Sequence, residues 1–166
     1  MSTTLRTLLF ALLFALIMQL QLNLDTDKTA SRQLKNSLEL AVHDAGLAIS
    51  PAALSEGKII FDKEKSLENL KNSLNNNLKL KSSQGYVYTP TANSFFQKEL
   101  YLVHLEFIDD SISRTYPFVY YNDNYQVFEN VEGPCVIAIV TTESPRWFKG
   151  DLAMIRQAAV YEYKNK

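Results

Sequence analysis

The sequence has little of what marks several common protein classes. Its 166 residues include 5 glycines, 5 prolines and a single cysteine, Cys135. One cysteine cannot form an intramolecular disulfide, and no cysteine–histidine cluster has the spacing of a zinc site. The 17 basic and 18 acidic residues are scattered and leave a formal net charge of −1, so no nucleic-acid partner is expected. A chain of this length has room for one domain and an appended segment.

Catalytic motifs are absent from the sequence as well. It contains no phosphate-binding loop, dinucleotide fingerprint, zinc-protease motif or serine-hydrolase elbow. His104 and Glu106 could pair on one face of a strand, and Asp109 and Asp110 adjoin each other without further spaced ligands. Cys135 lies within the apolar run CVIAIV, where burial disfavours the thiolate. We therefore expect no enzyme activity, no cofactor and no metal.

The longest apolar run lies near the N-terminus. Residues 8–18 read LLFALLFALIM, and the run thins through QLQLNL. Leu8 to Leu22 would give about 22 Å of helix, and extension to Leu24 approaches the ~20 residues of a membrane span. We predict an uncleaved membrane anchor over residues 1–24. A cleaved signal peptide is the alternative, although the nearest cleavage point, after Ala30, has Lys28 where a small residue is needed.

Basic residues on the two sides of this run bear on its orientation. Arg6 precedes it, whereas Lys28, Arg32 and Lys35 follow it, so their count favours a cytoplasmic C-terminal part. A short apolar N-terminus normally directs export, however. We expect a single-pass protein of the cell membrane whose C-terminal domain is extracytoplasmic.

The anchor is predicted to continue as one helix into the following segment, residues 25–49. Between residues 4 and 45 the sequence has no glycine or proline that would break a helix. Small or apolar residues recur at steps of four and three, with one stutter, and form a heptad-like seam across the membrane boundary. This predicted seam for helix packing and assembly consists of Leu9, Leu13, Leu16, Leu20, Leu24, Leu34, Leu38, Ala41, Ala45 and Ala48.

Asp27 and Ser31 interrupt the seam just beyond the boundary. Gly46 and Pro51 are expected to end the helix. The alternative is two helices with a kink near residues 25–27, where an aspartate could cap the second helix.

Residues 50–166 are predicted to form a globular α+β head, with an antiparallel sheet of four to six strands packed on the long helix and on one further helix. Leucines at helical spacing predict the further helix over residues 63–80. Within the strand predicted over 99–108, Tyr101, Val103, Leu105 and Phe107 should share one face. The other predicted elements are strands at 58–62, 86–88, 135–140 and 158–164, a hairpin at 115–131, and one helical turn within 144–157.

This plan, an apolar N-terminus that continues into an amphipathic helix and an α+β head, resembles that of type IV pilins and pseudopilins. The segment LKNSLELAVHDAGLAIS, residues 34–50, is similar in style to the Tad-type (tight adherence) minor pilins. Those pilins carry a glycine at the peptidase cleavage site and a glutamate five residues into the apolar run. Here no glycine precedes Gly46 and no glutamate precedes Glu39, so a recognisable prepilin cleavage site is missing.

The resemblance implies a membrane-anchored structural or assembly subunit of a bacterial surface or secretion apparatus. Its N-terminal helix would pack against like or related subunits in an oligomer or a larger assembly. The alternative function is that of a single-pass membrane protein whose extracytoplasmic domain binds a ligand or a partner.

Overall fold

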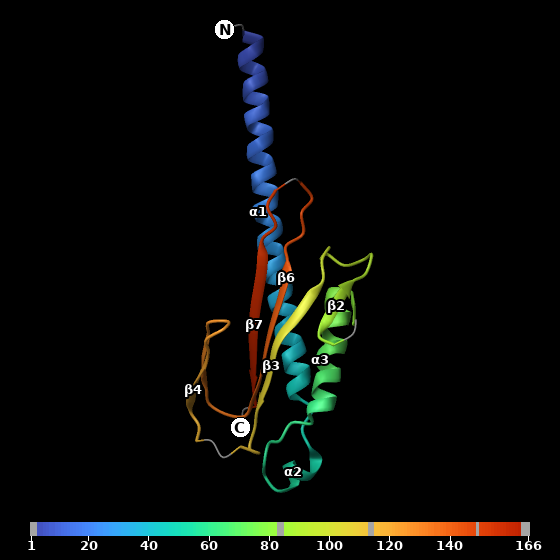
Figure 1. Ribbon diagram of the computed structural model, residues 1–166, viewed down its shortest axis with the longest axis vertical. Helices are drawn as coiled ribbons and strands as arrows, with labels where there is room; N and C mark the ends of the chain where they lie inside the picture. The colour runs from blue at the N-terminus through green and yellow to red at the C-terminus, as the bar shows by residue number, and fades with distance from the viewer. Residues whose placement is uncertain (1–2, 83–84, 113–114, 149, 164–166) are drawn as a thin grey trace.

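The computed structural model describes residues 3–82, 85–112, 115–148 and 150–163. Its fold is α+β, with one long N-terminal helix packed on an antiparallel sheet domain that contains further helical segments, as predicted (Figure 1). The helices are α1 (Thr3–Gly46), α2 (Pro51–Ser55) and α3 (Lys63–Leu78). The strands are β1 (Leu80–Ser82), β2 (Val87–Pro90), β3 (Leu100–Ile108), β4 (Phe118–Asn122), β5 (Val127–Val131), β6 (Cys135–Glu143) and β7 (Met154–Glu162).

Helix α1 is one continuous helix of 44 residues, about 66 Å long at 1.5 Å per residue. Its N-terminal half projects from the head, and its C-terminal half lies within it (Figure 1). It ends at Gly46, and Pro51 then takes the first turn of α2. The predicted continuity is confirmed, and the alternative of a kink near residues 25–27 is wrong.

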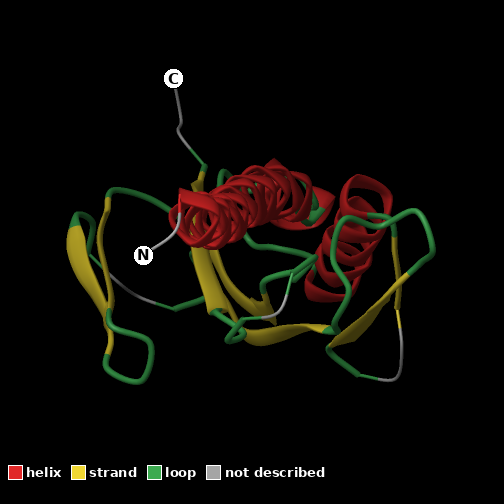
Figure 2. Ribbon diagram, turned by 90° about the horizontal axis from the view of Figure 1, so that it is seen from above, coloured by secondary structure: helices red, strands yellow, loops and turns green. Residues whose placement is uncertain are grey.

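The main sheet has five strands in the order β1-β2-β3-β6-β7, and all neighbouring pairs are antiparallel. Helices α1 and α3 lie together over one of its faces (Figure 2). Strand β6 is internal to this sheet, and its residues 135–140 are all fully buried. Alternate residues of β6 join the core under the helices or a second cluster on the opposite face, so the prediction of a covered central strand is confirmed.

The predicted hairpin at 115–131 forms, but outside the main sheet. Among the residues that the structure describes, strands β4 and β5 pair with each other and with no strand of the main sheet, and they stand to one side of it (Figure 2). Tyr120 and Val131 from the hairpin pack against Ile108, Cys135 and Ile137. The hairpin therefore covers part of the sheet face that the helices leave open.

Residues 58–62 do not form the predicted strand and make only an isolated bridge between Ile49 and Phe61. The backbone N–H of Ile59 donates to Asp110 Oδ2 at 2.7 Å, and that of Phe61 donates to Asp109 Oδ2 at 3.2 Å. Two side-chain carboxylates thus satisfy backbone donors that a neighbouring strand would otherwise bond.

The prediction that Tyr101, Val103, Leu105 and Phe107 share one face of β3 is wrong. The register against β6 shifts between Leu102 and His104, which places one extra residue in β3. Before this bulge Leu102 points into the core and Tyr101 is exposed, whereas after it Leu105 and Phe107 pack on the core.

Three further differences concern the edge strands of the sheet and the connection that precedes β7. Strand β1 was not predicted, and β7 begins at Met154, four residues before the predicted start at 158. Within residues 144–148 and 150–153 the structure has no helical turn, which makes that prediction wrong. The β6–β7 connection instead rises beside α1 toward the N-terminal half of that helix (Figure 1).

Candidate functional site

The exposed half of α1, residues 3–24, is the most unusual surface of the molecule. Its large apolar side chains are all substantially exposed, from 39% at Met18 to 66% at Phe10. They project on every side of the helix, and the most apolar window of 18 residues is 0% buried. By length and composition this helix is able to cross a membrane. From Leu5 to Leu24 it would extend about 30 Å, which equals the thickness of a bilayer's hydrocarbon core.

The structure divides the predicted seam into two parts. Its first part is exposed, with 48–63% of each side chain accessible, and consists of Leu9, Leu13, Leu16, Leu20 and Leu24. Its second part is buried in the head, with 0–3% accessible, and consists of Leu34, Leu38, Ala41, Ala45 and Ala48. Leu34, Leu38, Ala41 and Ala45 pack in the core between this chain's own sheet and α3, so they are already occupied within one molecule. Ala48 lies beyond the end of α1 at Gly46, so the predicted extension of the helix to residue 49 is wrong.

Gly46, the last residue of α1, lets strand β7 approach the helix closely. A Cβ atom built on Gly46 would lie 2.1 Å from Cδ1 of Tyr161, a distance at which something must shift. The Tyr161 ring also meets His43 edge-on, with ring centroids 4.9 Å apart. Gly46 thus permits a close contact between α1 and β7, while Ala41 and Ala45 lie in the core of the head.

Asp27, just beyond the exposed half of α1, bonds the helix to the β6–β7 connection of the head. Arg146 in the β6–β7 connection donates to both oxygens of the Asp27 carboxylate, with Nη2 3.2 Å from Oδ2, and Ser144 Oγ donates to Oδ1. Arg146 Nε also donates to the carbonyl oxygen of Asp151 at 2.9 Å, which holds the guanidinium in place. The ion pair therefore fixes the β6–β7 connection against the helix just past the apolar run.

The pKa of Asp27 reflects these contacts. Partial burial alone would raise it, but the hydrogen bonds from Arg146 and Ser144 and the charge of Arg146 outweigh that effect and leave the pKa lowered. The carboxylate is thus held in its ionised form. Sequence reasoning treated Asp27 only as an interruption of the seam or as a helix cap, and no local signal points to a partner so far along the chain.

A second polar cluster attaches the hairpin to the sheet. His104 Nε2 lies 3.1 Å from Glu106 Oε2 and 2.9 Å from the Tyr120 hydroxyl, and that hydroxyl donates to Glu106 Oε2 at 2.8 Å. Asn122 donates to the Tyr120 hydroxyl at 3.3 Å. The contact that the sequence allowed between His104 and Glu106 is present, and Tyr120 of the hairpin joins it.

Burial and the hydrogen bond to Glu106 raise the pKa of Tyr120, partly offset by the bond from Asn122. The hydroxyl therefore stays protonated at neutral pH and acts as a donor between β3 and β4.

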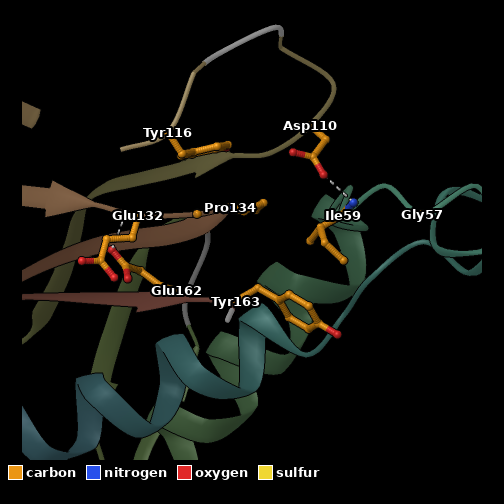
Figure 3. A pocket seen from close by; sticks show the side chains of 9 residues that line it. Gly57, Ile59, Asp110, Tyr116, Glu132, Pro134, Glu162 and Tyr163 are labelled. Atoms are coloured by element: carbon orange, nitrogen blue, oxygen red, sulfur yellow. Dashed lines mark hydrogen bonds between the residues drawn. The ribbon is translucent and has the colours of Figure 1, made fainter. Parts of the chain in front are cut away.

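An open cavity of about 420 Å³ lies at the opposite end of the head from the exposed helix. Glu132 and Glu162 lie side by side at one end of it, and Asp110 reaches Ile59 at the other (Figure 3). Glu162 Oε1 accepts from the backbone N–H of Glu132 at 3.2 Å. The carboxylates of Asp110 and Glu162 thus tie chain segments together. Within the part of the chain that the structure describes, no group of three or more potential metal ligands occurs.

Comparisons with known proteins give no match, whether to a family model, a curated protein or a solved structure. The exposed half of α1 and its junction with the head are thus the features from which function is inferred.

Proposed function

We propose that this chain is a membrane-anchored structural or assembly subunit, similar in plan to a pilin or pseudopilin. The observation that carries the proposal is the exposed half of α1, which is apolar on all sides and continuous with a half that is fixed in the head. A helix that is apolar all round belongs in lipid or among other helices. The α+β head on the end of that helix agrees with the plan that the sequence resembles.

The division of the seam indicates how such a subunit would work. Leu9 through Leu24 would lie against the same face of a neighbouring helix, where side-chain packing drives association within lipid. The buried half of α1 and the ion pair at Asp27 fix the head relative to the helix. Packing of two helices would therefore also set the positions of their heads, which is what an assembling subunit requires.

Single-cysteine cross-linking tests this proposal. Cys135 is buried and is the only cysteine, so a Cys135→Ala background accepts one new cysteine at a time along α1. At 100° per residue, Ala11, Ala15, Met18 and Leu22 lie opposite the seam and serve as matched controls. After reconstitution into vesicles, we expect disulfide-linked dimers from cysteines at Leu9, Leu13, Leu16 and Leu20 and far fewer from the controls.

Each variant is first compared with the wild type by thermal unfolding of the head, so that only folded proteins are scored. Equal cross-linking on both faces, or none at any position, would overturn the assembly proposal. Membrane-bound monomers would favour the alternative, a single-pass protein whose head binds a ligand or a partner.

A further inference from the structure

The β6–β7 connection lies at the level where the apolar part of α1 ends. A Cβ atom on Gly150 would lie 3.0 Å from Nδ2 of Asn23, and Arg146 is paired with Asp27 one helical turn further on. The connection is therefore held against the last turns of the exposed half (Figure 1).

The β6–β7 connection and the first residue of β7 expose large apolar side chains. Trp147 is 63% exposed, Phe148 46%, Leu152 53% and Met154 64%, all within eight residues of sequence. A single exposed apolar residue is ordinary on a protein surface, whereas four large ones in so short a stretch of chain indicate a contact surface. This group also adjoins a helix whose own exposed side chains are apolar.

The length of the exposed half of α1 sets the depth of the β6–β7 connection relative to the membrane. If the span begins at Leu5, about 30 Å of hydrocarbon ends at Leu24, next to Asn23. Tryptophan is enriched at the boundary between lipid and water, because its ring is apolar and its N–H needs a polar partner. Trp147 and Phe148 thus lie close to the level that such side chains prefer.

We propose that the β6–β7 connection inserts into the membrane interface beside α1 and holds the head against the bilayer. The proposal rests on the membrane anchoring proposed above and adds a second contact with lipid. A single helix could tilt or slide, whereas two linked contacts fix both the height and the rotation of the head. The Asp27–Arg146 pair positions the connection while lipid covers its apolar side chains.

Trp147 is the only tryptophan, so its fluorescence reports on this connection alone. The full chain is reconstituted into vesicles of phosphatidylcholine and phosphatidylglycerol, with or without bromine on the upper acyl carbons, and flotation measures membrane binding. We expect loss of Trp147 emission with the brominated lipids and protection from iodide in the aqueous phase. Flotation should be complete, because α1 anchors the chain.

Paired variants show whether lipid contact depends on the apolar side chains of this connection. The double variant Phe148→Ser, Leu152→Ser should weaken quenching by brominated lipid and increase quenching by iodide without loss of flotation. The control is Phe128→Ser, which removes an even more exposed apolar residue from the hairpin and should change neither signal.

The outcomes distinguish this inference from the proposed function. A chain that floats but whose Trp147 is quenched by iodide and not by brominated lipid overturns the interfacial contact alone. Protection from both quenchers would place Trp147 against protein, such as a second copy, and would also overturn it. A chain that does not float overturns both proposals.

Discussion

Asp27 on α1 and Arg146 in the β6–β7 connection form an ion pair across 119 residues of sequence, with Nη2 and Oδ2 3.2 Å apart. Only 11% of the Arg146 side chain and 28% of the Asp27 side chain are exposed. The pair lies where the helix leaves the head, so it is the polar contact that joins the exposed apolar half to the folded domain.

Asp27→Asn should destabilise the head in a pH-dependent way. Because the pKa of Asp27 is lowered on folding from an ordinary value of 3.8, its contribution is complete above that value and disappears as the pH falls through the folded-state pKa. We expect a loss of about 1–3 kcal/mol near neutral pH, measured by chemical unfolding of the full chain in detergent. The difference from wild type should vanish well below pH 4. Asp25→Asn, at an exposed position two residues earlier, is the control, and an equal loss at both pH values would contradict the expectation.

Gly46→Ala should destabilise the packing of α1 on β7. The added methyl group would meet the Tyr161 ring, whose Cδ1 lies 2.1 Å from the place that a Cβ atom would take, so the ring or the helix must move. Overpacking of this kind costs about 1–3 kcal/mol. Leu40→Ala, at an exposed position of the same helix, should change the unfolding free energy far less. Combining Gly46→Ala with Tyr161→Ala should cost less than the sum of the two single changes; strict additivity would show that the contact is not the cause.

Tyr120→Phe should loosen the hairpin without unfolding the sheet. The variant removes a hydroxyl that donates to Glu106 at 2.8 Å and accepts from Asn122, at a net cost of about 1 kcal/mol. Hydrogen exchange should speed up across β4 and β5 and stay unchanged in β6 and β7. Tyr121→Phe, whose side chain is 58% exposed on the outer face of the hairpin, is the matched control. If hydrogen exchange in the hairpin did not change, the apolar cluster alone would hold the hairpin on the sheet, and the prediction would be wrong.

The parts of the fold that were predicted correctly are those with strong local signals. The absence of glycine and proline and the spacing of leucines specify α1, and the apolar run of Cys135–Val140 specifies an internal strand. Residues 58–62 have a strand-like composition, yet the carboxylates of Asp109 and Asp110 take the place of a strand partner. The bulge in β3 likewise depends on its register with β6, which alternation within β3 does not record.

The candidate site, too, could be predicted only in part from local sequence patterns. Periodicity placed Leu34, Leu38, Ala41 and Ala45 on the face of α1 that the head buries, but a leucine and alanine stripe has the same spacing whether it meets another molecule or its own sheet. Which of these two surfaces the stripe meets depends on residues far along the chain, such as Tyr161 and the β6 side chains. The pairing of Arg146 with Asp27 was missed because Arg146 lies in a segment without regular structure.

A leucine-to-alanine substitution should lower the unfolding free energy of the head in the buried part of the seam but not in the exposed part. Leu38 is fully buried, so Leu38→Ala removes core contacts and should lower the unfolding free energy of the head by about 3–5 kcal/mol. Leu20 is 63% exposed and lies outside the core, so Leu20→Ala should leave that free energy within about 0.5 kcal/mol of wild type. In vesicles the second variant should instead weaken helix association, measured by energy transfer between labelled chains, while Leu22→Ala on the opposite face should not. If Leu20→Ala destabilised the head as much as Leu38→Ala, the whole seam would serve folding, and its exposed part would no longer be available to explain assembly.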